Sequence, residues 1–167
     1  MSVVLDIVRT YRSPRKVMTR RVGTRPREDR ALAVLMGACV LIFVAQWPRL
    51  AREAYLDDAI GFDALLAGAL FAWLMMAPLL FYVIALAVQG VLRLVRRTAS
   101  GYAVRMMLFW GLLAATPLFL LTGLTAGFVG EGVALSVVSA LSLAALLVFW
   151  GVGISVIAPS TPPATEA

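Results

Sequence analysis

The sequence has no histidine, one cysteine and one lysine among its 167 residues. A single cysteine cannot form a disulfide within the chain, and without histidine no Cys/His cluster can hold a metal. Charged residues make up only 14% of the chain, whereas soluble domains carry about 25%. Because 62% of the residues are apolar and the mean hydropathy is +0.92, the composition excludes a soluble enzyme.

Four apolar runs are present, and each is long enough to cross a bilayer, which takes about 20 residues in a helix. The runs cover residues 31–48, 64–92, 104–129 and 133–157. The runs lack the alternation of polar and apolar residues that is typical of β-strands. A backbone in lipid must also satisfy its own hydrogen bonds, so we expect helices. The sequence predicts an all-α polytopic membrane protein, with a bundle of four transmembrane helices in a membrane domain of residues 26–157.

Arginine and lysine are distributed unevenly between the predicted loops. Residues 1–30 hold nine of the fifteen, the segment 93–105 holds four, and the loop after the first run holds Arg49 and Arg52. With four crossings, one side of the membrane collects thirteen basic residues and the other side two. The positive-inside rule then predicts that both termini are cytoplasmic.

Residues 1–25 form a basic segment ahead of the first run. Val4, Ile7, Val8 and Tyr11 recur at helical spacing and predict a short amphipathic helix, which Ser13-Pro14 interrupts. We expect this segment to lie on the anionic inner leaflet of the membrane. Two alternatives stay open, namely that the charges only fix topology and that the segment docks a protein partner. The residues expected to contact the lipid surface are Arg9, Arg12, Arg15, Lys16, Arg20 and Arg21.

Titratable side chains are nearly absent from the four runs. The exceptions are Cys39, Tyr82 and Arg105, and Arg105 lies at the start of the third run, where it can reach the interface. Pumps, ion-coupled carriers and intramembrane proteases place acids, histidine or lysine at membrane depth. No nucleotide-binding motif and no nucleophile–base pair is recognisable either. The sequence therefore predicts a protein without catalytic activity, metal or cofactor, and it gives no indication of nucleic acid as a partner.

Small residues and prolines mark the helix faces on which packing is expected. Small residues let helix backbones approach closely in lipid, and they serve either packing within the bundle or contact with another copy or a partner helix. A proline inside a helix removes one backbone hydrogen bond and bends it, which is typical of packing helices and also of substrate paths. The expected packing or partner contacts are Gly123, Gly127, Ser136, Ser139 and Ser142, and the expected kinks are Pro78 and Pro117.

The basic N-terminal segment, with Pro14 followed one turn later by Met18, precedes apolar helices rich in Gly, Ala and Pro. In the stretches YRSPRKVMTRRV and PREDRALAVLMGACVLIFVAQWPRLA the chain resembles a bacterial member of the Yip family of integral membrane proteins. The resemblance implies a non-catalytic membrane protein tied to trafficking, membrane shape or the organisation of complexes. Fourteen arginines to one lysine, with abundant Ala, Gly and Leu, favour a bacterial source and hence the inner membrane.

Three functional hypotheses follow. The first is a Yip-like integral membrane protein that acts by binding, scaffolding or membrane organisation. The second is an accessory or assembly subunit of a larger inner-membrane complex, and the third is a small transporter. The tail 158–167, which contains three prolines among small residues, is expected to be disordered in the cytoplasm.

Overall fold

A computed structural model of the chain describes residues 3–22, 27–57, 60–97 and 99–158. Over these residues it contains helices and no strand. Four helical runs are long and apolar enough to cross a membrane, which confirms the predicted all-α polytopic bundle. They are α3 (Glu28–Leu56), the continuous run of α4 (Phe62–Phe71), η1 (Ala72–Met76) and α5 (Ala77–Leu94), then α6 (Gly101–Phe128) and α7 (Val133–Ile157).

The first spanning helix is longer than predicted. The apolar run ends at Pro48, but α3 continues to Leu56, so residues assigned to a loop form its last turns. An ion pair one helical turn apart supports these turns, because Arg49 Nη1 lies 2.8 Å from Glu53 Oε2. Hydropathy marks where the apolar stretch stops, whereas helix continuation depends on local pairing that hydropathy does not measure.

The second run contains a π-helical turn, η1, directly before Pro78. In this turn the Ala77 amide donates to the Ala72 carbonyl, five residues earlier instead of four. Pro78 then falls in the first turn of α5, where the missing amide hydrogen costs least. The irregularity predicted at Pro78 therefore takes the form of a π turn inside an otherwise continuous helix.

Pro117 lies inside α6, which runs without interruption from Gly101 to Phe128. A proline at this position leaves the Leu113 carbonyl without its usual amide donor. The Thr116 hydroxyl donates to that carbonyl at 2.7 Å. This substitute hydrogen bond satisfies the carbonyl and lets the helix pass the proline in an apolar environment.

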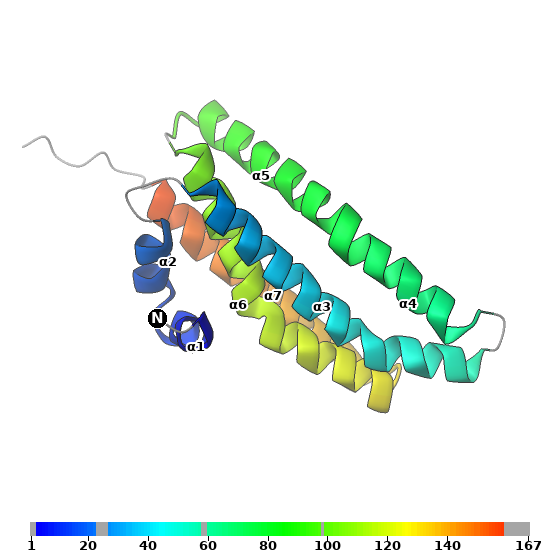
Figure 1. Cartoon of the computed structure of the whole chain (residues 1–167). Coiled ribbons are helices and arrows are strands. Elements are labelled where there is room, and N and C mark those ends of the chain that lie inside the picture. Colours follow the sequence, from blue (N-terminus) through cyan, green and yellow to red (C-terminus); the bar gives the residue numbers. More distant parts are fainter. Residues whose placement is uncertain (1–2, 23–26, 58–59, 98, 159–167) are drawn as a thin grey trace, which may run out of the picture.

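α6 is the central helix at one end of the bundle. Every residue from Tyr102 to Thr116 is buried except Arg105, which is half-buried and pairs with Glu28 at the start of α3. Two short helices, α1 (Val3–Arg12) and α2 (Pro14–Val22), lie against α6 and α7 at this end, while α3 and α5 cover other sides (Figure 1). Because helices surround this half of α6, it is apolar on all faces and has no single hydrophobic stripe.

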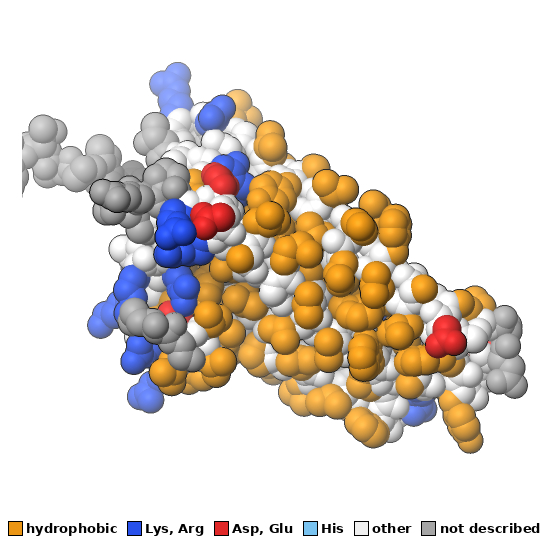
Figure 2. Space-filling view, viewed as in Figure 1, with side chains coloured by type: hydrophobic (Ala, Val, Ile, Leu, Met, Phe, Trp, Pro, Cys, Tyr) orange, Lys and Arg blue, Asp and Glu red, His pale blue; other side chains and the backbone are white. Residues whose placement is uncertain are grey.

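Charge is segregated along the molecule. Figure 2 shows Lys and Arg side chains gathered at the end that carries α1 and α2, with hydrophobic side chains covering the flank of the bundle. This end also carries Arg93 in the last turn of α5 and Arg96 and Arg97 just after it. Ala158, the first residue of the tail 158–167 predicted to be disordered, is instead buried directly after α7, and its carbonyl accepts a hydrogen bond from Arg97. The rest of that tail, residues 159–167, and the predicted boundary between residues 25 and 26 fall outside the described residues.

Candidate functional site

The candidate site is the pair of helices α1 and α2, which we call the N-terminal hairpin (residues 3–22). α1 ends at Arg12 and α2 begins at Pro14, so Ser13 alone connects them. Val4 and Val8 of the predicted apolar row face outward, 68% and 58% exposed, whereas Ile7 is partly buried and packs against the bundle. The opposite face, which carries Asp6 and Thr10 one turn apart, is buried against the bundle. α1 therefore buries a polar pair, Asp6 and Thr10, and exposes the two valines on the opposite side, which a soluble surface helix would bury.

Trp110 of α6 anchors the buried face of α1. Its indole Nε1 donates to Thr10 Oγ1 at 3.2 Å, and the Thr10 hydroxyl donates to the Asp6 carbonyl at 2.7 Å. The guanidinium carbon of Arg21, on α2, lies 4.0 Å from the centroid of the Trp110 ring. One aromatic side chain thus binds both helices of the hairpin, through a hydrogen bond to α1 and a cation–π contact to α2.

Tyr11 makes the second polar contact between α1 and the bundle. Its hydroxyl donates to the Ala114 carbonyl of α6 at 3.0 Å, and its ring meets Phe149 of α7 edge-on at a centroid distance of 5.2 Å. Burial raises the pKa of Tyr11, so the phenol is neutral at physiological pH. The neutral hydroxyl can then serve as a donor, which the carbonyl requires.

Asp6 is the single acidic residue among residues 1–25, and it is almost completely buried. Its carboxylate forms an ion pair with Arg21 and lies 3.7 Å from Arg20 Nη2 and 3.8 Å from Arg9 Nη1. A buried charge is tolerated only when it is paired. Asp6 therefore links α1 to α2 and partly neutralises the basic residues around it.

Apolar packing closes the contact between α2 and the bundle. Met18 is fully buried and lies near Gly153 of α7, on the same side as Met107 of α6. A Cβ added at Gly153 would lie 2.1 Å from Met107 Cγ and 3.2 Å from Met18 Sδ. The absence of a side chain at Gly153 therefore makes room first for Met107 of α6 and then for the Met18 sulfur of α2.

The structure places the residues predicted to contact the lipid surface in two environments. Arg21 is mostly buried, between Asp6 and Trp110, and so helps to hold the hairpin in place. The other five point outward from the hairpin and are exposed: Arg9, Arg12, Arg15, Lys16 and Arg20.

Gly123 and Gly127 lie against α3. A Cβ at Gly123 would come within 1.7 Å of the Ala45 carbonyl oxygen, and one at Gly127 within 2.4 Å of Pro48 Cβ. Both glycines therefore let α3 and α6 pack closely, and α3 occupies this face of α6.

The serines of α7 do not form one contact face. Ser142 is buried, and its Oγ lies 2.8 Å from Thr122 Oγ1 and 3.1 Å from the Leu118 carbonyl of α6. Ser139 is half-buried and Ser136 is exposed. A period of three residues drifts around a helix of 3.6 residues per turn, so only the last of the three serines faces α6.

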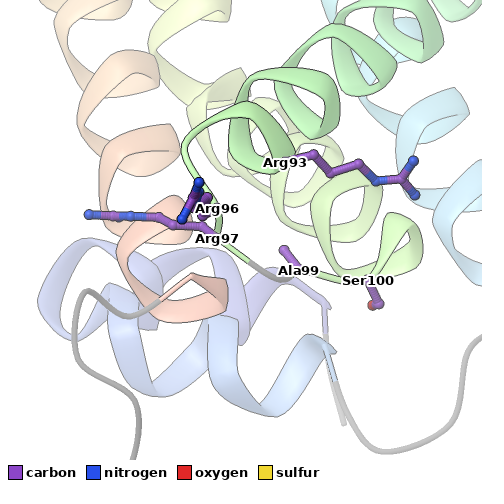
Figure 3. A pocket seen from close by; sticks show the side chains of 5 residues that line it. All are labelled: Arg93, Arg96, Arg97, Ala99 and Ser100. Carbon is purple, nitrogen blue, oxygen red and sulfur yellow. The ribbon is translucent and has the colours of Figure 1, made fainter.

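A basic pocket of about 600 Å³ lies where α5 is connected to α6. Figure 3 shows that Arg93 points away from Arg96 and Arg97, so the three guanidinium groups do not converge. Arg97 Nη1 donates to the Ala158 carbonyl at 3.0 Å, and the Ser100 hydroxyl accepts the Ala103 amide at the start of α6. The three arginines therefore do not form a single anion site.

Sequence reasoning found the basic surface of the hairpin but missed the residues that hold it in place. The signal for Asp6 and Thr10 was their spacing, because the single acid of the segment and a hydroxyl one turn later form a polar row opposite the apolar one. Trp110 stands six residues inside its apolar run 104–129 and not at the boundary, so an interfacial preference explains it only in part. Within the described residues no group of His, Cys, Asp and Glu could hold a metal ion.

No protein-family model, curated protein or solved structure matches this chain. The resemblance to the Yip family therefore stays a prediction.

Proposed function

We propose that the chain is a non-catalytic protein of the bacterial inner membrane that acts by binding, scaffolding or organising the membrane, as the Yip-like resemblance implies. Its N-terminal hairpin contacts the anionic inner leaflet, both termini are cytoplasmic, and neither a cofactor nor nucleic acid takes part. One observation carries the proposal: the hairpin is fixed to α6 and α7 while five of its basic side chains point outward.

The fixed position of the hairpin matters because it holds the basic side chains in one arrangement relative to the membrane. A loose basic tail would fix topology equally well, and a loose tail needs no buried ion pair, indole hydrogen bond or tyrosine contact. The hairpin instead presents its cations in one arrangement, beside an exposed apolar row on α1. Each basic residue near an anionic leaflet contributes about 1 kcal/mol, and exposed apolar side chains add to membrane binding.

Amide hydrogen exchange of the full chain in nanodiscs tests the proposal. Discs of phosphatidylcholine alone are compared with discs that also contain phosphatidylglycerol. We expect slower exchange in α1 and α2 when the anionic lipid is present, and equal exchange in the turns around Arg49 and Glu53 at the other end of the bundle. Equal exchange of the hairpin in both kinds of disc would refute contact with the anionic leaflet.

Orientation needs its own test. Reporter fusions at the two ends of the chain are expected to report the cytoplasm in both cases, as the distribution of thirteen and two basic residues predicts. Fusions that report opposite faces would contradict an even number of crossings.

An accessory subunit of a larger membrane complex is the second candidate. It is favoured by the exposure of α4–α5 and α7, which are the least buried of the spanning helices. Purification after mild solubilisation separates the two functions. A stable complex with a second membrane protein in fixed stoichiometry supports the subunit function. A monomer or homo-oligomer supports a protein that works without a partner protein.

A further inference from the structure

A pocket of about 370 Å³ opens on the outer side of the N-terminal hairpin, where α1 meets α2. Four of its lining side chains are cationic and come from both helices. The residues that line it are Arg9, Arg12, Ser13, Lys16, Val17 and Arg20.

The charge of this pocket is only partly balanced. Asp6 lies beneath it and is shared among Arg9, Arg20 and Arg21. Arg12 and Lys16 have no ion pair with any described residue, and Asp6 is the single acid of residues 1–25. Like charges held close together repel, and an anion placed between them removes the repulsion. Guanidinium and ammonium groups around a small pocket suit a phosphate group in particular.

Two exposed valines of α1 precede Arg12, a pocket residue, on the same helix. Val4, Val8 and Arg12 follow each other at intervals of four residues, so they lie on one face of the helix, with both valines exposed. α1 contacts α6 at Trp110 and Ala114, deeper along that helix than Arg105. At a rise of about 1.5 Å per residue, Ala114 lies roughly 20 Å from the Gly101 end of α6. An acyl chain can therefore cover the valines while a headgroup reaches the cations.

We propose that the pocket binds one anionic phospholipid, with its phosphate held by Arg9, Arg12, Lys16 and Arg20 and one acyl chain along Val4 and Val8. This inference rests on the proposed function and narrows it, because it replaces general attraction to a charged surface by a site for a single lipid. A free phosphate compound would use the same cations but not the valine row, which is why the lipid is favoured.

Native mass spectrometry of the full chain, released from micelles of a neutral detergent, counts bound lipids and gives their affinities. Three probes are compared: dioctanoyl phosphatidic acid, dioctanoyl phosphatidylcholine and glycerol 3-phosphate. We expect one phosphatidic acid to bind at least about tenfold more tightly than either of the others, because only this probe combines an unmasked phosphate with acyl chains. Equal binding of glycerol 3-phosphate would overturn the assignment of a lipid, and equal binding of phosphatidylcholine would overturn the role of the cations.

Charge-matched variants locate the binding. Arg12→Gln and Lys16→Gln each remove one pocket charge that takes no part in fixing the hairpin, and each is expected to weaken phosphatidic acid binding by about tenfold. Arg30→Gln removes one exposed charge from the first turn of α3, outside the pocket, and is expected to change the affinity by less than about twofold. Val8→Asn tests the apolar row. It is expected to weaken the binding of phosphatidic acid but not the binding of glycerol 3-phosphate.

Failure of this inference differs from failure of the proposed function. If Arg12→Gln, Lys16→Gln and Arg30→Gln weaken lipid binding equally while anionic nanodiscs still slow exchange in the hairpin, the site is refuted and contact with the leaflet stands. If anionic nanodiscs leave hairpin exchange unchanged, the proposed function fails as well.

Discussion

The N-terminal hairpin and the long helix α4–α5 are attached to the same bundle by different kinds of contact. The hairpin is short and basic, and polar groups hold it in place. The Trp110 indole and the Tyr11 hydroxyl join it to α6, and the Asp6–Arg21 pair joins its two helices. α4–α5 is long and apolar and meets the bundle through packed rings, such as Tyr82 on Phe109 and Phe81 near Trp150.

The difference shows what each kind of contact can specify. Lipid tails are as apolar as leucine, so an apolar helix gains little by leaving lipid for protein, and its position is weakly determined. A hydrogen bond or ion pair has one partner and one geometry, so it fixes position even where the contact area is small. The hairpin is therefore expected to be sensitive to single polar substitutions, and α4–α5 is expected to tolerate them.

The largest expected effect comes from Asp6→Ala. This change leaves Arg21 without its carboxylate partner and brings Arg9, Arg20 and Arg21 into mutual repulsion, so undocking of the hairpin becomes easier by about 3 kcal/mol. Amide hydrogen exchange in α1 and α2 measures this decrease in the free energy of undocking. Asp29→Ala, which removes an exposed ion pair with Arg27, is the matched control and should leave exchange in α1 and α2 nearly unchanged. Equal effects of the two substitutions would show that Asp6 does not hold the hairpin.

Glycine substitutions sharpen the comparison further. Gly153→Ala places a methyl group against Met107 and Met18, and overpacking of this kind costs about 1–3 kcal/mol. Gly90→Ala in α5 and Gly151→Ala in α7 enter open space and are expected to be neutral or slightly stabilising. Thermal unfolding in detergent ranks the three. A destabilisation at Gly90 as large as that at Gly153 would mean that α5 packs as closely at Gly90 as α7 packs against Met107 and Met18.

A smaller effect is expected from Tyr11→Phe, which deletes the hydroxyl that donates to the Ala114 carbonyl but keeps the ring on Phe149. The hydrogen bond contributes about 1 kcal/mol. The protection of α1 against amide exchange should fall by about this free energy, with little change in α4–α5. Tyr55, which is 85% exposed, provides the control substitution Tyr55→Phe. If both tyrosine variants behave like the unmodified chain, the contact between Tyr11 and α6 is not stabilising.

The pH dependence of docking is expected to be the smallest effect. Burial raises the pKa of Tyr11 above its ordinary value of about 10, so the undocked hairpin loses this proton first. Docking is therefore unaffected below about pH 10 and weakens as the pH rises further, because ionisation favours the undocked state. The dependence should disappear in Tyr11→Phe. A loss of docking between pH 6 and pH 9 would point to a different group.

Hydropathy was enough to predict the four spanning helices, because length and apolar content alone decide whether a helix can cross lipid. It could not predict that α3 continues past Pro48, since that extension depends on local pairs such as Arg49 with Glu53. Nor could it predict the π turn at Ala72–Met76, although Pro78 marked the place.

The basic character of the hairpin was readable from composition, but its docking was not. Trp110, Ala114 and Gly153 are separated from α1 and α2 by about a hundred residues or more, and no local pattern links positions that far apart. The pairing of Gly123 with Ala45 is of the same kind, because the GxxxG spacing predicts close packing without naming the partner helix.

The central claim is that a fixed basic hairpin meets the anionic leaflet, and a spin label on α2 tests it most directly. Thr19→Cys in a Cys39→Ala background keeps every basic residue, and Thr19 is exposed on α2. In nanodiscs containing phosphatidylglycerol, the label should be immobile and poorly accessible to a water-soluble nickel chelate, with greater accessibility in phosphatidylcholine discs. A mobile label that is fully accessible in both kinds of disc would contradict the account.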